Sequence, residues 1–228
     1  MDDEIVLIRK KERNKGIWAI VLYFVLTFLF AIGLVVVKLV LGGTVSSATS
    51  DSSMTMALVV PEAILFIIFI FMYRKTLRSD FKSLTKREYK IIGLGIAATF
   101  LANIVIGIIL AHFNVTNDNQ DILDTFFNKY PLFIFIDVAF IGPLVEEIVF
   151  RKAISSIIRN DIAFVVVSSI IFGVMHGVGI ATILYVFMGA LWAVIFIKVN
   201  KNVMATTMVH MANNLVAALL LLLSLVMK

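Results

Sequence analysis

The chain has 228 residues, of which 61% are hydrophobic and only 15% are charged, and its mean hydropathy is +1.03. A water-soluble domain of this length needs a far more polar surface, so the composition excludes aqueous globular folding. The absence of cysteine excludes disulfides, thiolate metal sites and cysteine nucleophiles. The formal net charge of +5 does not indicate a nucleic-acid partner, because the charges cluster in short segments between apolar runs.

The first apolar runs have the length of membrane-spanning helices. A charged segment, residues 1–16, precedes an apolar run over residues 17–41 that is too long for a signal peptide, so we expect it to remain as an anchor. Two further runs cover residues 54–73 and 91–113. About 20 apolar residues in a helix cross a bilayer core of roughly 30 Å. The sequence therefore predicts three spans in the first half of the chain.

The second half continues with helical elements. A fourth helix is predicted from Tyr130 to about Ile158. The next two elements, residues 162–176 and 180–199, are short and are expected to form a hairpin, and the last span covers residues 203–227. The predicted fold is all-α, a polytopic transmembrane bundle of about seven or eight helices. It consists of an N-terminal tail over residues 1–16 and one transmembrane domain over 17–228, with the functional core at 130–227.

The distribution of basic residues predicts an orientation. Of the 20 Lys and Arg residues, all but Lys38, Lys129 and Lys228 lie on one side of the bundle if the first helix starts in the cytoplasm. The loop over residues 42–53 has no basic residue, and the loop over 114–129 is acidic. The positive-inside rule then predicts a multi-pass protein of the cell membrane with a cytoplasmic N-terminus.

The fourth helix carries charged residues inside an apolar element. Glu147 and Arg151 are four residues apart, so they share a helix face and can pair. Glu146 points about 100° away from Glu147 and is left for another partner. Charged groups at membrane depth are expensive and by default indicate a functional site, although a structural ion pair is the alternative interpretation.

Two later elements carry imidazole and amide groups. His176 ends the fifth element, and His210 and Asn214 share a face of the last span. Counting 1.5 Å per residue places these groups and Glu146 in a common layer near mid-membrane. A carboxylate and an imidazole, directly or through a metal, activate water against a carbonyl, while a second imidazole and an amide stabilise an oxyanion. Structural hydrogen bonding between helices is the alternative.

These groups form three ordered motifs that resemble those of the CAAX protease and bacteriocin-processing family of membrane proteins, also called Abi. That family includes the type II CaaX prenyl endopeptidases and bacteriocin-immunity relatives. The resemblance covers about residues 130–227. The motifs are Glu146-Glu147-x-x-x-Arg151, Phe172-x-x-x-His176 and His210-x-x-x-Asn214.

The resemblance implies an intramembrane endopeptidase that acts on a peptide or a membrane-associated protein. Glu146 and His176 would activate the attacking water, and His210 and Asn214 would stabilise the oxyanion. In supporting roles, Glu147 and Arg151 would hold the fourth helix in position, and Phe172 would form a pocket wall.

The family is usually described as metalloproteases, with zinc as the suspected ion. Glu146, His176 and His210 would then be its ligands, because two imidazoles and a carboxylate suit zinc. A metal-free glutamate mechanism needs the same residues, so both alternatives stay open.

Two other functions are compatible with the sequence. A non-catalytic immunity or regulatory protein would bind a peptide or a membrane partner, and a coupled carrier would use the buried Glu and His residues as a relay. No inverted internal repeat supports a carrier. Three further polar residues lie inside spans and could line a polar cavity or cross-link helices, without an assignment to catalysis: Glu62, Asn103 and Asp137.

Overall fold

The protein is described by a computed structural model over residues 2–40, 47–113, 126–177, 179 and 181–227. These residues are helical almost throughout and include no β-strand, which confirms the predicted all-α membrane bundle. Within this part of the chain, three helical stretches are long and apolar enough to cross a membrane: Glu4–Gly33, Lys86–Phe113 and Val203–Leu225. The two predicted loops lie partly outside the described residues, at 41–46 and 114–125.

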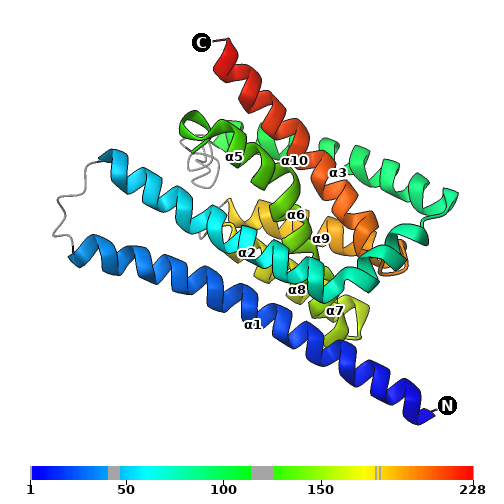
Figure 1. The fold of residues 1–228 in the computed structure, drawn as a ribbon. Helices are drawn as coiled ribbons and strands as arrows, with labels where there is room; N and C mark the ends of the chain where they lie inside the picture. Colours follow the sequence, from blue (N-terminus) through cyan, green and yellow to red (C-terminus); the bar gives the residue numbers. More distant parts are fainter. Residues whose placement is uncertain (1, 41–46, 114–125, 178, 180, 228) are drawn as a thin grey trace.

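The first two helices run side by side along one face of the bundle (Figure 1). Helix α1 (Asp2–Val40) begins at its charged segment, so the predicted tail is helical from residue 2 onwards. Lys, Arg and Glu are good helix formers, and hydropathy marks only the apolar part of such a helix. A methyl group at Gly16 would lie 2.9 Å from the Ala153 carbonyl oxygen, so α1 packs closely against the predicted fourth helix (Pro131–Ile157), here called the fourth helical segment. Helix α2 (Ser47–Lys82) contains Pro61.

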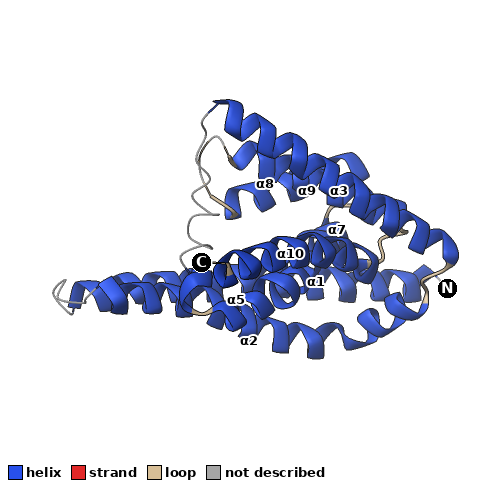
Figure 2. Ribbon diagram, turned by 90° about the horizontal axis from the view of Figure 1, so that it is seen from above, coloured by secondary structure: helices blue, strands red, loops and turns tan. Residues whose placement is uncertain are grey.

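Helix α10 (Val203–Val226) lies between two layers of the bundle (Figure 2). One layer contains α3 (Lys86–Phe113), α8 (Asp161–Met175) and α9 (Thr182–Lys198), and the other contains α2. Helix α10 contacts both layers as well as the fourth helical segment, so its polar face lies inside the protein.

Helices α8 and α9 form the predicted hairpin and pack closely along their length. A Cβ atom at Gly173 would lie 2.9 Å from the backbone nitrogen of Val186, so only glycine allows this approach without a shift. Gly177 follows α8 with a φ of +135°, a conformation that favours glycine.

The predicted fourth helix is helical from Pro131 to Ile157 but changes its winding four times. Two of its five segments are π-helical, which sequence periodicity did not predict. Segments of this kind are rare and frequently lie at functional sites. The five segments are α5 (Pro131–Ile136), η1 (Asp137–Ile141), α6 (Gly142–Glu146), η2 (Glu147–Ala153) and α7 (Ile154–Ile157).

Candidate active site

A cavity of about 580 Å³ is lined by residues of α1, α2, α3, α8, α9 and α10 and of the fourth helical segment. Its lining includes the four residues predicted to be catalytic and the predicted wall residue: Glu146, His176, His210, Asn214 and Phe172. Glu147 and Arg151 do not line the cavity and are completely buried behind it. The structure thus separates a cavity-facing group from a supporting pair.

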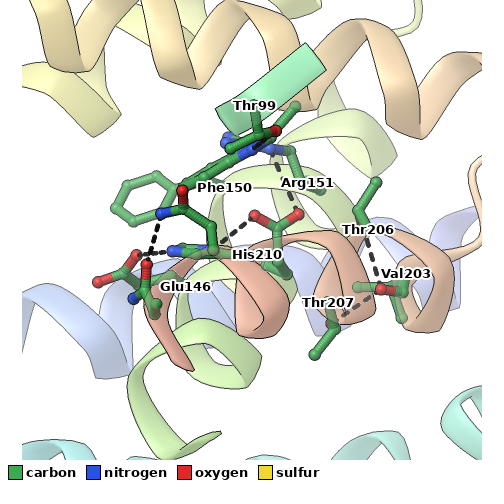
Figure 3. A network of polar contacts seen from close by, with 12 residues as sticks. Thr99, Glu146, Phe150, Arg151, Val203, Thr206, Thr207 and His210 are labelled. Atoms are coloured by element: carbon green, nitrogen blue, oxygen red, sulfur yellow. Dashed lines mark hydrogen bonds and ion pairs between the residues drawn. The ribbon is translucent and has the colours of Figure 1, made fainter. Parts of the chain in front are cut away.

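Glu146 stands between the two imidazoles. Its Oε1 lies 3.9 Å from His176 Nε2, and its Oε2 lies 3.7 Å from His210 Nε2. Figure 3 shows Glu146 on one side of the His210 ring and Arg151 on the other. Both distances exceed that of a direct hydrogen bond and suit a bridging water. The carboxylate is therefore arranged to share water with two nitrogen atoms.

The hydrogen bond on the far side of His176 determines its tautomer. His176 Nδ1 lies 2.8 Å from the backbone oxygen of Phe172, one turn earlier in α8. A carbonyl oxygen only accepts hydrogen bonds, so Nδ1 carries the proton. In the neutral ring, Nε2 then presents a lone pair to Glu146.

His210 has the same tautomer for a different reason. Its Nδ1 lies 3.2 Å from Glu147 Oε1, and a carboxylate accepts the proton of this nitrogen. Neutral His210 therefore presents a lone pair, and no N–H, to the cavity. The predicted role of His210 as an oxyanion donor requires that the ring gain a second proton.

Glu147 is held beneath His210 by a buried ion pair. Arg151 Nε lies 3.4 Å from Glu147 Oε2, and neither side chain is exposed. Arg151 Nη1 donates to Ser168 Oγ at 2.8 Å, and this hydroxyl donates to the Phe150 carbonyl oxygen at 2.7 Å. Because a buried charge is costly without a partner, these contacts tie η2 to α8 and hold Glu147 in place.

Aromatic rings from α9 cover both imidazoles. The Trp192 ring centroid lies 3.8 Å from that of His210, and Tyr185 stacks on His176 at 4.8 Å. Trp192 Nε1 donates to Thr99 Oγ1 of α3 at 3.1 Å. Sequence reasoning missed these residues. A signal was present for Trp192, since tryptophan in spans prefers the interface and this one lies in the interior of α9.

Asn214 is oriented by a chain of amides. Its Nδ2 donates to the Val138 carbonyl oxygen at 3.0 Å, and its Oδ1 accepts from Asn213 Nδ2 at 3.0 Å. Asn103 Nδ2 of α3 donates in turn to Asn213 Oδ1. The chain fixes which end of the Asn214 amide carries hydrogen, and Val138 occupies only one of its two N–H groups.

The donor groups of the site match part of what a metal ion requires. The two Nε2 lone pairs and the Glu146 carboxylate are donor types that zinc accepts. In each ring, the second nitrogen is bound to an oxygen, as is usual for histidine ligands. As the side chains stand, however, no group of three His, Asp or Glu residues in the described part of the chain is arranged as a ligand set.

Comparisons with known proteins agree with the motifs. Residues 128–216 match the family model described as type II CAAX prenyl endopeptidase Rce1-like. The membrane-embedded CAAX protease MroQ of Staphylococcus aureus (strain USA300) is 32% identical over 133 residues, which cover 53% of this chain and 53% of that protein.

A second relative is an uncharacterized protein of Mycoplasma capricolum subsp. capricolum. It is 31% identical over 184 residues, which cover 72% of this chain and 54% of that protein. The chain thus spans about half the length of the curated relatives it matches. No solved structure matches the chain.

Proposed function

We propose that this membrane protein is an intramembrane endopeptidase, because residues 128–216 match the model of the Rce1-like type II CAAX prenyl endopeptidases. The observation that carries the proposal is the position of Glu146, whose two oxygens each face the Nε2 lone pair of a different histidine at the edge of one cavity. This arrangement suits the activation of water.

The proposed reaction uses a water between Glu146 and His176. The water donates one hydrogen bond to the carboxylate and one to Nε2, so its oxygen lone pair is directed at the carbonyl carbon of the substrate. As that oxygen attacks, its proton passes to Glu146. When the C–N bond breaks, Glu146 returns the proton to the leaving amine, in the usual sequence of general base and general acid.

The negative charge that develops on the carbonyl oxygen needs hydrogen-bond donors. Asn214 would supply the N–H that does not bind Val138. His210 would supply Nε2–H once its ring has taken up a second proton from solvent before the reaction. The charged ring would then lie between the carboxylates of Glu146 and Glu147. Donors held in place before the reaction are worth more in an enclosed site than in water.

Zinc is proposed as a cofactor, with Glu146, His176 and His210 as the residues that would hold it. Bound there, the ion would act as a Lewis acid and assist the ionisation of water. This assignment is an alternative to the metal-free reaction, because a His210 Nε2 that held the ion would carry no proton, and Asn214 alone would then donate to the oxyanion. Metal analysis of purified protein tests this assignment: stoichiometric zinc that is lost in His176→Ala and His210→Ala supports it, and metal-free protein that remains active contradicts it.

We propose a cytoplasmic N-terminus and a peptide or membrane-associated protein as substrate. The second proposal is supported by the relative named a membrane-embedded CAAX protease. The chain contains no cysteine, so a single cysteine introduced at Lys10 and labelled from one side of the membrane tests the orientation.

The function is tested by comparing the peptides of cells that carry the wild type, Glu146→Gln or Glu4→Gln. We expect Glu146→Gln to slow one cleavage by about 10²–10⁴-fold, because the base is lost while the side-chain shape is kept. Glu4→Gln changes an exposed carboxylate outside the cavity and should cut normally. A binding protein without catalysis would retain its function in both variants, and normal cleavage by Glu146→Gln would refute the role of Glu146 as the base.

A further inference from the structure

A second acidic group faces the cavity and has no part in the proposed reaction. Glu62 follows Pro61 inside α2, and Asp137 opens η1 of the fourth helical segment. Their carboxyl groups lie next to each other, and both line the cavity that contains Glu146. Helix α2 and segment η1, which are distant in sequence, thus bring a pair of carboxyl groups to one wall of the cavity.

Among the described residues of the cavity lining, no Lys or Arg faces this pair. Asp137 is only 7% exposed, and its Oδ1 has no hydrogen-bond partner among the described residues. Three carboxyl groups line the cavity, those of Glu62, Asp137 and Glu146, and no described Lys or Arg does. Buried acidic groups need protons or cations to neutralise them. A hydrogen bond between two carboxyl groups requires one proton, and a cation from a ligand can take its place.

The pair lies close to the proposed water site. Glu62 Oε2 is 3.2 Å from the place where a Cβ atom of Gly142 would be, so the carboxyl group sits against α6. Gly142 precedes Glu146 by one helical turn, or about 6 Å along the axis. An extended peptide advances roughly 3.3 Å per residue, so this distance corresponds to about two residues of a bound peptide.

We propose that Glu62 and Asp137 form a subsite for a cationic group of the peptide substrate, a Lys or Arg side chain within about two residues of the bond that is cut. A charged amine or guanidinium would donate to both carboxylates and satisfy Asp137 Oδ1. Much of the remaining lining is apolar, including Met175, Leu184 and Leu220, and suits hydrophobic neighbours of the basic residue. The inference rests on the proposed function and adds a substrate class to it.

Binding of two matched peptides tests the subsite without cleavage. The full-length Glu146→Gln protein in neutral detergent micelles is titrated with a short apolar peptide that carries one lysine and a neutral fluorophore. The same peptide with acetyl-lysine serves as the control, because acetylation removes the charge and keeps the chain. We expect the lysine peptide to bind about tenfold more tightly, since hydrogen bonds to ionised groups are the strong ones.

Two isosteric variants assign that preference to the pair. Asp137→Asn and Glu62→Gln, each on the Glu146→Gln background, should bind the two peptides equally. Glu4→Gln, a matched change outside the cavity, should keep the preference. If a pocket variant fails to fold, the two peptides on the Glu146→Gln protein still decide whether a cation is preferred.

Equal binding of the lysine and acetyl-lysine peptides would overturn the subsite, and so would a preference that survives in both pocket variants. Cleavage by the wild type is measured separately. If the wild type cuts peptides with and without a basic residue equally well, the result supports the proposed function and contradicts the subsite. If the lysine peptide binds more tightly but no peptide is cut, the result supports the subsite and contradicts the proposed function.

Discussion

The two imidazoles that face Glu146 are supported in different ways. His210 lies within α10, exposes 3% of its side chain, and is covered by Trp192 while Glu147 accepts the proton of its Nδ1. His176 directly follows the last residue of α8, exposes 19% of its side chain, and bonds to a backbone oxygen of its own helix.

Because the two imidazoles are supported differently, substitutions at them should affect the stability of the protein to different degrees. The partners of His210 come from η2 and α9, so its ring is part of the packing between helices. The hydrogen bond of His176 is made to α8, and its contacts with other helices are the stacked Tyr185 of α9 and, at 3.9 Å, Glu146 of α6. Changes around His210 should therefore reduce both stability and activity, whereas changes at His176 should reduce activity with a smaller loss of stability.

The strongest test of this contrast is the ion pair beneath His210. Arg151→Ala should lower the free energy of unfolding by about 3–5 kcal/mol, because it leaves the Glu147 charge buried and unpaired. Thermal unfolding in detergent measures the loss. The double variant Glu147→Leu with Arg151→Met removes both charges and should be far more stable than Arg151→Ala. If Arg151→Ala is as stable as the wild type, the Glu147–Arg151 ion pair does not stabilise the packing around His210.

The two histidines provide the direct comparison. His210→Ala should destabilise the protein by about 2–3 kcal/mol, in the upper part of the range for single substitutions, because it leaves a gap under Trp192. His176→Ala should destabilise it by less, about 1 kcal/mol, because this ring is more exposed. Both variants should lose cleavage. Equal stability of the two variants, measured in the same detergent, would contradict the prediction that His210 contributes more to stability than His176.

The last test concerns the indole over His210. Thr99→Val removes the acceptor of the Trp192 N–H and should destabilise the protein by about 1 kcal/mol. A slower cleavage rate should accompany this loss, because the indole positions the imidazole. Thr76→Val removes the acceptor of Lys15 Nζ instead and serves as the control, with cleavage expected to stay normal. A normal cleavage rate in Thr99→Val would show that the Trp192 indole packs against His210 without positioning its imidazole.

Features that stand out locally along the chain could be predicted from the sequence. Glu146, His176 and His210 interrupt apolar runs, and the cost of polar groups at membrane depth marks them as a set. The structure brings them to one cavity, while their chemical roles stay a prediction. The expected i, i+4 pair of Glu147 and Arg151 is present, although π-helical winding surrounds it.

The remaining features depend on contacts between helices. Periodicity identifies the face of a helix on which a side chain lies, but it does not identify the partner across an interface. The contact of Trp192 with His210 and that of Glu62 with Asp137 therefore could not be predicted. Sequence reasoning noted Glu62, Asp137 and Asn103 as buried polar residues, and only the structure shows what each one meets.

The π-helical winding of η2 has a consequence for the alignment of relatives. Its hydrogen bonds skip one residue more than those of an α-helix, so this stretch holds more residues per turn. Deleting a single residue there would restore regular winding, and because the wider turn absorbs that residue, the segments before and after it would keep nearly the same faces. Glu146 would stay on its side of the helix. A relative with a regular α-helix here would therefore align to this stretch with a one-residue gap.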